Sequence, residues 1–273
     1  IVLMHAYAFP DHEKLIAGIA KEIGFTQIST SHETSPLVKF VGRGDTTVVD
    51  AYLSPILSHY VQQVEDALGL KPDSNTKLMF MMSNGGLTSA HLFQGKDAIL
   101  SGPAGGVVGA VATSQLAGFD ALIGFDMGGT STDVSHFAGN LERTFDTEVA
   151  GVRVRAPMMQ IHTVAAGGGS LLQFQDGRLQ VGPDSAGSTP GPACYRRGGP
   201  LAVTDANVML GKLRPEFFPT IFGPNQDQPL DTNIVAKRFA EMAQISNADK
   251  SPEALAEGFL SVAVENMANA IKK

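Results

Sequence analysis

The chain has 273 residues, of which 43% are apolar and 17% are charged, and its formal net charge is −7. This composition can build a core, which argues against an intrinsically disordered chain, and the acidic balance argues against a nucleic-acid-binding protein. No stretch reaches about 18 uninterrupted apolar residues, so no membrane span is expected, and the single cysteine, Cys194, cannot form an internal disulfide, which is typical of the cytoplasm.

The first part of the chain is expected to alternate strands with helices. Residues 1–8 form an apolar run typical of a buried strand, and a short strand is expected at residues 25–29. Between them, Asp11 is placed to cap a helix with one apolar face, made of Leu15, Ile16, Ile19 and Ile23. Residues 31–46 are polar and are expected to form a loop. A long helix follows over residues 47–68, with these side chains facing inward: Val48, Ala51, Tyr52, Ile56, Tyr60, Val64 and Leu68.

The rest of the chain continues this alternation. A hairpin is expected around Asp176-Gly177, and a last helix begins after Ser251, its expected N-cap. Strands that alternate with helices predict an α/β fold, with a domain boundary near Gly118 where one helix ends. The other expected elements are a turn at residues 70–75, strands at residues 77–83, 122–126, 132–137, 149–154 and 160–164, and helices at residues 107–116, 204–213 and 235–243.

Both ends of the chain are expected to be cuts in a longer protein. Residues 1–8 begin directly in an expected strand, and the helix after Ser251 reaches the end of the chain without a glycine stop signal. We therefore expect these 273 residues to be a piece of a larger polypeptide.

The most specific motif is Asp-Met-Gly-Gly-Thr-Ser-Thr-Asp-Val at residues 126–134. An apolar strand delivers Asp126 to its exposed end, Gly128 and Gly129 permit a tight turn, and free backbone amides in such a turn can bind phosphate oxygens. Asp126 is a candidate to hold a hydrated Mg²⁺ or to orient an attacking group. A plain hairpin with glycine at its bend is the alternative. Three hydroxyls and a second carboxylate follow: Thr130, Ser131, Thr132 and Asp133.

This motif resembles a phosphate-binding hairpin of the actin, Hsp70 and sugar-kinase superfamily. More narrowly, the chain resembles the hydantoinase/5-oxoprolinase family, as a hydantoinase A-type subunit. Phe-Gly-Pro at residues 222–224 and Gln-Pro-Leu at residues 228–230 are similar to segments of ATP-dependent 5-oxoprolinases. The other supporting segments lie at residues 83–87, 101–109, 162–170, 181–195 and 198–207.

The resemblance implies an α/β fold of actin-like (ribonuclease H-like) domains. Residues 1–118 would be the C-terminal part of a first domain, and residues 119–273 a second domain, truncated at its C-terminus, that carries the hairpin. The implied activity is an ATP- and Mg²⁺-dependent amidohydrolase, which converts 5-oxo-L-proline, ATP and water to L-glutamate, ADP and phosphate in glutathione metabolism. Asp126 and Asp133 are then the catalytic candidates, with Asp126 also binding the metal.

The implied partners are a small cyclic amide and either the rest of the polypeptide or a hydantoinase B-type subunit, in an oligomer that involves neither nucleic acid nor membrane. Hydantoin hydrolysis, ATP-dependent ketone carboxylation, sugar phosphorylation and a non-catalytic nucleotide-binding module remain alternatives. The chain also departs from the family pattern. Members begin with a first Asp-Gly-Gly-Thr motif, whereas this chain has one such motif, in mid-chain. A complete ATP site needs both halves, so the isolated chain is expected to be inactive.

Two further glycine clusters are expected to be walls of the nucleotide site. Residues 101–109 lead into a helix, whose N-terminus attracts anions, and Gly105 and Gly106 are the candidate contacts. Close packing of that helix on a strand is the alternative. The second cluster follows an apolar strand and combines three glycines with a hydroxyl: Gly167, Gly168, Gly169 and Ser170.

The remaining polar candidates have less specific patterns. Cys194 has no histidine near it in sequence, so a nucleophilic role is not expected. His162 is either a polar site group or a structural residue. Asp205 fits a substrate or metal contact as well as a helix cap. The roles of five further residues stay open between a site contact and a structural position: Asn207, Arg196, Arg197, Gly198 and Gly199.

Overall fold

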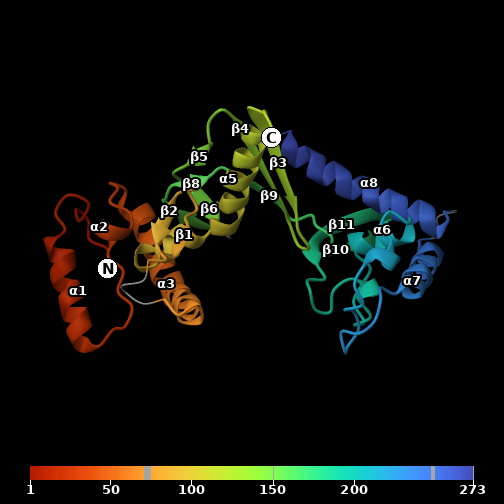
Figure 1. Ribbon diagram of the computed structural model, residues 1–273, viewed down its shortest axis with the longest axis horizontal. Helices are drawn as coiled ribbons and strands as arrows, with labels where there is room; N and C mark the ends of the chain where they lie inside the picture. Colours follow the sequence, from red (N-terminus) through yellow and green to blue (C-terminus); the bar gives the residue numbers. More distant parts are fainter. Residues whose placement is uncertain (71–74, 150, 247–249, 273) are drawn as a thin grey trace. The chain divides into compact units, whose positions relative to one another are not determined.

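The computed structural model describes residues 1–70, 75–149, 151–246 and 250–272 (Figure 1). It contains two compact units, one made of Ile1–Leu122 with His136–Ile161 and the other of Ile123–Ser135 with His162–Lys273. The chain first changes unit shortly after the boundary expected at Gly118, and residues 136–161 then return to the first unit. The turn expected at residues 70–75 falls largely on residues outside the described ranges.

The first unit combines helices with short antiparallel strand pairs. Helix α3 packs against α2, α4 and β7, and α5 packs against β1. Its apolar core is divided into three small clusters, centred on Val61 and Phe93, on Val107 and Phe137, and on Met158. The elements are α1 (Asp11–Ile23), α2 (Ser31–Thr34), α3 (Phe40–Leu68), β1 (Met79–Met81), β2 (Leu87–Ser89), α4 (Gly95–Ala98), α5 (Ser101–Leu116), β5 (Arg143–Thr144), β6 (Thr147–Val149), β7 (Val152–Val154) and β8 (Met158–Met159).

The strands predicted at residues 1–8 and 25–29 are wrong. Ile1 donates its amino group to the carbonyl oxygen of Ser29 (2.8 Å), and its own carbonyl accepts from Ser31 N–H (3.0 Å). Residues 4–8 then form turns instead of extending a ladder. The Leu3 N–H donates to the carboxylate of Glu13 (2.8 Å), so a side chain takes the place of a neighbouring strand.

The loop predicted at residues 31–46 is also wrong, because α2 and the first turns of α3 occupy it. The helices at residues 11–23 and 47–68 exist, but the faces expected to point inward lie exposed. Ile23 on α1 is 70% exposed and Tyr52 on α3 is 74% exposed. The buried side chains of these helices are instead largely polar: Glu13 on α1, and Arg43, Thr46, Thr47, Asp50, Ser54 and Val61 on α3, where Gly42 is also buried.

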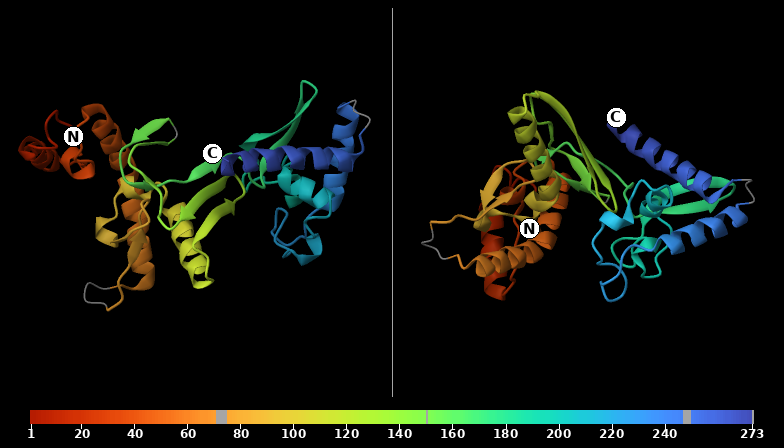
Figure 2. Two further views of the ribbon diagram at one scale, coloured as in Figure 1. Left: turned by 90° about the horizontal axis from the view of Figure 1, so that it is seen from above. Right: turned by 45° about the vertical axis from the view of Figure 1, so that its right-hand side comes forward.

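The second unit has one contiguous core. Helix α8 packs against α6, α7 and β11, and Figure 2 shows it beside the β10–β11 hairpin. The core includes Phe239 of α7, Phe259 of α8 and Leu172 of β10. Ser251 caps α8 by accepting a hydrogen bond from Ala254 N–H, as predicted. The elements are β9 (His162–Val164), β10 (Ser170–Gln175), β11 (Arg178–Ser185), α6 (Val203–Met209), α7 (Thr232–Ile245) and α8 (Pro252–Ile271).

A three-stranded sheet carries the Asp-Met-Gly-Gly-Thr segment. Its strand order is β3-β4-β9, where β3 is Ala121–Met127 and β4 is Thr132–Ala138. β4 and β9 are antiparallel, with Thr132 opposite Val164 and Val134 opposite His162. The predicted strands and the α/β class are therefore confirmed in this region. Among the described residues, no helix is long and apolar enough to cross a membrane.

Candidate functional site

The turn between β3 and β4 is tight and exposed, as its glycines predict. Gly128 N–H donates to the carbonyl oxygen of Ser131 (2.9 Å), which closes the hairpin and leaves Gly129 and Thr130 at its tip. A Cβ atom placed on Gly129 would meet nothing within 4 Å. The Asp126 side chain near the end of β3 is also exposed. A carboxylate and an open stretch of backbone therefore lie within one short segment of the second unit.

The glycine triplet packs directly against the backbone of this turn. Gly168 N–H donates to the carbonyl oxygen of Gly128 (3.0 Å), and Gly169 N–H donates to that of Gly129 (2.6 Å). A Cβ atom on Gly167 would lie 2.8 Å from the Gly128 oxygen, and one on Gly169 would lie 2.8 Å from the Gly129 oxygen. The triplet therefore has glycines because two backbone segments approach each other closely.

These hydrogen bonds fix the direction of two turn amides. In a planar trans peptide, the carbonyl of one residue and the N–H of the next point in opposite directions. The carbonyls of Gly128 and Gly129 point toward the triplet, so the N–H groups of Gly129 and Thr130 point away from it. Two successive amides on one side of an exposed turn form a concave set of donors suited to an anion.

The other predicted members of the site divide into supporting and exposed groups. Thr132 is buried and donates its hydroxyl to the carbonyl of Ala166 (2.6 Å). Ser170 is also buried, and its hydroxyl accepts from Gly167 N–H (2.9 Å). Asp133 accepts from the Thr163 hydroxyl (2.7 Å). Thr132 thus ties the hairpin to the residue before the triplet and Ser170 braces the triplet itself, whereas Asp126, Thr130 and Ser131 remain at least partly accessible.

Gly105 and Gly106 lie in the first unit, inside α5. This helix begins at Ser101 rather than at residue 107, and Ala104 N–H already bonds to the Leu100 carbonyl (2.9 Å). The two glycines therefore occupy the second turn and not the loop before the helix. A Cβ atom on Gly105 would approach Met81 at 3.7 Å, and one on Gly106 would meet nothing within 4 Å. The proposed contact of these glycines with nucleotide stays a prediction.

Asp205 is a buried carboxylate that organises backbone. Helix α6 begins at Val203 with Ala202 as its N-cap, so neither Thr204 nor Asp205 is the cap residue itself. From the third helical position, Asp205 accepts the N–H groups of Ala202 (2.8 Å), Ala193 (2.9 Å) and Cys194 (2.8 Å). Burial raises the pKa of Asp205 despite these three donors.

The neighbouring candidates are also engaged in structure. Burial and then the nearby Asp205 charge raise the pKa of the Cys194 thiol far above its ordinary value, so it is not an activated nucleophile. Arg196 pairs with Asp231 (2.9 Å). The other four positions are accounted for as follows: Arg197 donates to the Gly223 carbonyl, Asn207 donates to the Val203 carbonyl, Gly199 packs against the Gly191 carbonyl, and Gly198 has a positive φ.

His162 is exposed on β9 and lines a surface groove of about 350 Å³. Asn266 and Asn269 of α8 lie on the same groove. Within the described residues, no group of three or more His, Cys, Asp or Glu side chains could hold a metal ion by itself.

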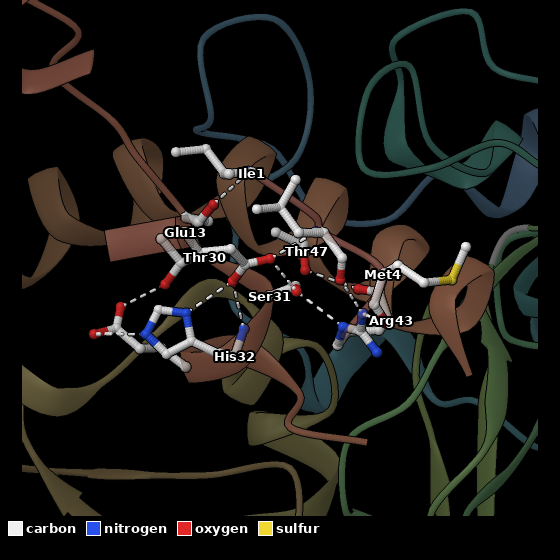
Figure 3. A network of polar contacts seen from close by, with 11 residues as sticks. Ile1, Met4, Glu13, Thr30, Ser31, His32, Arg43 and Thr47 are labelled. Atoms are coloured by element: carbon white, nitrogen blue, oxygen red, sulfur yellow. Dashed lines mark hydrogen bonds and ion pairs between the residues drawn. The ribbon is translucent and has the colours of Figure 1, made fainter. Parts of the chain in front are cut away.

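A buried polar network in the first unit was not foreseen from the sequence (Figure 3). Glu13 is fully buried, and its carboxylate accepts from the Ser31 hydroxyl (2.6 Å), from His32 Nδ1 (2.7 Å) and from the N–H groups of Leu3 and His32. Burial would raise the pKa of Glu13, but these hydrogen bonds outweigh it and hold the pKa below the ordinary value. A single glutamate in the first turn of an amphipathic helix gives no sequence signal of such a role.

Arg43 extends this network and uses all five of its donors. Nε donates to the Ser31 hydroxyl (2.8 Å), and the other four N–H groups meet backbone carbonyls of Leu3, Met4, Leu37 and Val38. The Ser31 hydroxyl thus accepts from Arg43 and donates to Glu13 (Figure 3). The network joins three parts of the first unit: the residues before α1, helix α2, and the segment between α2 and α3.

Comparison with known proteins agrees with this architecture. The family model for hydantoinase/oxoprolinase matches residues 43–273. The 5-oxoprolinase of Saccharomyces cerevisiae is 48% identical over the whole chain, which spans 22% of the yeast protein. The crystal structure of the ATP-dependent caprolactamase from Pseudomonas jessenii matches with a TM-score of 0.78 and 31% identity, over 100% of this chain and 39% of that one.

A nucleotide-free acetone carboxylase structure shares the fold, with a TM-score of 0.80 and 23% identity over 100% of this chain and 39% of the other. The actin-like assignment of the fold is consistent with these structural neighbours. The chain spans about a fifth of the length of the curated relative named above. The match of the family model over most of the chain, together with identity along all of it, shows that the chain belongs to the hydantoinase/oxoprolinase family.

Proposed function

We propose that this chain is part of an ATP-dependent enzyme that hydrolyses a cyclic amide, with 5-oxo-L-proline as the substrate and L-glutamate, ADP and phosphate as the products. The observation that carries this proposal is the 48% identity with the yeast 5-oxoprolinase along the full 273 residues. The similarity to a protein described as an ATP-dependent caprolactamase supports both the lactam and the use of ATP.

The residues of the hairpin suit a phosphate and its metal. The N–H groups of Gly129 and Thr130 point away from the triplet, and the space beside Gly129 is open. Backbone donors held in place before the reaction stabilise developing negative charge without having to reorganise. Asp126 offers the oxygen donor that Mg²⁺ prefers. These groups fit a nucleotide phosphate with its cation.

The proposed roles follow from where each group lies on the hairpin. Asp126 would bind the cation or orient the attacking group, and Ser131 would add a hydroxyl at the turn. Asp133 is held by Thr163 and would act as a second carboxylate beside the turn. Bound ATP would supply the phosphoryl group that activates the poorly electrophilic lactam carbonyl: transfer to its oxygen would release ADP, water would then add to the carbonyl carbon and the ring C–N bond would break, and hydrolysis of the resulting acyl phosphate would release L-glutamate and phosphate. The backbone amides of Gly129 and Thr130 would stabilise the phosphate charge during that transfer.

The finer parts of the proposal concern the intact protein. We propose Mg²⁺ as the cation, a cytoplasmic location, a place in glutathione metabolism, and an oligomer completed by the rest of the polypeptide or by a hydantoinase B-type subunit. Gly105 and Gly106 are proposed as a further wall of the nucleotide site.

The test is substrate-stimulated phosphate release by the intact enzyme, with 5-oxo-L-proline, hydantoin, caprolactam and acetone offered in turn. We expect 5-oxo-L-proline to stimulate release most strongly. Asp126→Ala should lower this rate by at least about 100-fold without changing the fold, because it removes a group placed at the transferring phosphate. Stimulation by another of these compounds in place of 5-oxo-L-proline would assign a sister activity, and near-normal turnover of Asp126→Ala would refute the role of the hairpin.

A further inference from the structure

The Thr130 N–H is the end of a hydrogen-bonded chain that crosses two peptide groups. The Gly169 N–H donates to the Gly129 carbonyl, whose peptide carries the Thr130 N–H. The carbonyl of the preceding peptide, that of Gly168, accepts both the backbone N–H and the hydroxyl of Thr204, each at 2.8 Å. The Gly168–Gly169 peptide is therefore held at both of its ends, by donors on its oxygen and by an acceptor on its N–H, whereas the Gly129–Thr130 peptide is held at its oxygen and directs its N–H away from the triplet.

We propose that Thr204 is a positioning residue for the phosphate-binding turn. This inference rests on the proposed function, because it assigns a task to the same hairpin. Planar trans peptides pass an orientation from one hydrogen bond to the next. Bonds in such a chain also polarise one another, so a donor on the Gly168 oxygen strengthens the donor capacity of the Gly169 N–H and then of the Thr130 N–H. Thr204 thus aims the Thr130 N–H and makes it a stronger donor.

The hydroxyl of Thr204 does not serve as the cap of its own helix, α6. Ala202 is the N-cap of α6, and its N–H donates to the carboxylate of Asp205 (2.8 Å). Thr204, at the second helical position, turns its hydroxyl to the triplet. Asp205 in turn fixes the start of α6 by holding the N–H groups of Ala193 and Cys194. Thr204 therefore acts from a rigid base.

A parallel chain shows why Thr204 is the informative position. Ser170 N–H donates to the Gly167 carbonyl (3.1 Å), Gly168 N–H donates to the Gly128 carbonyl, and the peptide of Gly128 carries the Gly129 N–H. This second chain begins with a backbone donor inside the glycine-rich segment itself. The chain through Thr204 begins with a side chain, so a substitution can remove one of its bonds without removing a backbone group.

The experiment compares Thr204→Val with Thr204→Ser in the intact enzyme. Valine keeps the shape and the backbone N–H of Thr204 but lacks the hydroxyl, whereas serine keeps the hydroxyl. Ser261→Ala is the matched control, because it removes a hydroxyl-to-carbonyl bond on α8 of the same unit, outside the site. The first readout is independent of activity: hydrogen–deuterium exchange of the peptides that cover residues 126–134 and 165–170, with residues 172–181 of the β10–β11 hairpin as an internal reference.

We expect Thr204→Val to raise amide exchange in these two peptides, to lower kcat about tenfold and to weaken inhibition by ADP with orthovanadate to a similar degree, since the donor is misaligned and not removed. The KM for ATP should change less than kcat. Thr204→Ser and Ser261→Ala should stay within about twofold of the unaltered enzyme for each quantity. Unchanged exchange and vanadate inhibition in Thr204→Val would overturn the proposal, and so would equal losses in Thr204→Ser. An intact enzyme that does not respond to 5-oxo-L-proline would refute the proposed substrate, while the exchange data would still test Thr204.

Discussion

The two units stabilise their local structure in opposite ways. In the first unit, the helices α1 and α3 bury largely polar side chains, and the carboxylate of Glu13 collects donors from a serine, a histidine and two backbone amides. In the second unit, an apolar core surrounds α7 and α8, and the hairpin is held by contacts between glycine backbones. Side-chain chemistry therefore fixes the first unit, and close backbone approach fixes the hairpin of the second.

Two buried carboxylates make this difference measurable. Burial acts first on both and disfavours their charged forms. Around Glu13 the hydrogen bonds outweigh burial and lower the pKa, whereas around Asp205 burial wins and raises it. Glu13 also connects through Ser31 to the guanidinium of Arg43. The direction of each pKa shift therefore depends on whether the hydrogen bonds to the carboxylate outweigh its burial.

The largest expected effect comes from removing the centre of the first network. Glu13→Ala should lower the free energy of unfolding of the first unit by about 3–5 kcal/mol, because it leaves the buried donors of Leu3, Ser31 and His32 without their acceptor. Denaturant unfolding, followed by hydrogen exchange in α1 and α3, measures the loss. Glu22→Ala, an exposed position on the same helix, should stay within about 0.5 kcal/mol of the unaltered protein. A loss below about 1 kcal/mol for Glu13→Ala would show that the network is not what holds this unit together.

The backbone contact of the second unit should respond next most strongly. Gly169→Ala places a methyl group 2.8 Å from both the Gly129 carbonyl oxygen and the Ser185 hydroxyl. Overpacking of this kind costs about 1–3 kcal/mol, and it should also move the turn and weaken ATP binding by the intact enzyme. Thermal unfolding and calorimetric titration with ATP report the two effects. Wild-type stability and affinity in Gly169→Ala would contradict the close packing of triplet and turn.

The sequence predicts that the β3–β4 hairpin is present, but it does not predict the direction in which the N–H groups of its turn point. An apolar strand followed by Gly128 and Gly129 specifies a tight, exposed turn from local chemistry alone. The direction of the turn amides depends on Gly168 and Gly169, which are distant in sequence, and no local pattern encodes that contact. The triplet was expected to touch a ligand because glycines allow close approach; the structure shows its close approach to the backbone of the turn, and its contact with a ligand stays a prediction.

The first unit was harder to predict for a different reason. The apolar period of α1 correctly indicates a two-faced helix, but it does not say what covers the apolar face. Leu15 is 64% exposed and Ile23 is 70% exposed in a chain that spans about a fifth of its yeast relative. The residue that α1 buries, Glu13, would be placed on the solvated face by the same pattern.

A pH titration would sharpen the contrast between the two carboxylates. The folded-state pKa of Glu13 lies below its ordinary value of 4.5, so its stabilisation is complete above that pH and is lost as the pH falls through the lower folded value. The folded-state pKa of Asp205 lies above 3.8, so its contribution is largest below that pH and is lost as the pH rises through the raised value. Unfolding midpoints should be measured between about pH 3 and pH 7. The unaltered protein should lose stability toward acid through Glu13, and Glu13→Gln should lack that loss. Asp205→Asn should remove a pH dependence of the opposite sign, in which stability falls as the pH rises. If Glu13→Gln and Asp205→Asn removed pH dependences of the same sign, the assigned directions of the two pKa shifts would be contradicted.

The smallest expected effect concerns a glycine of the first unit that no close contact requires. Gly106→Ala adds a methyl group to the exposed second turn of α5, where nothing lies within 4 Å. Because alanine loses less backbone entropy than glycine in a helix, the substitution should raise the free energy of unfolding by about 0.5–1 kcal/mol. Gly106 is also proposed as part of the nucleotide site, so on that proposal the same methyl group should raise the KM for ATP of the intact enzyme. Gly169→Ala in the second unit and Gly106→Ala in the first unit should thus change the free energy of unfolding in opposite directions. The first lowers both stability and ATP affinity because it breaks a backbone contact, and the second lowers ATP affinity while it stabilises the fold. A Gly106→Ala enzyme that gains stability and keeps its KM would remove α5 from the nucleotide site and leave the hairpin as the phosphate contact of this chain.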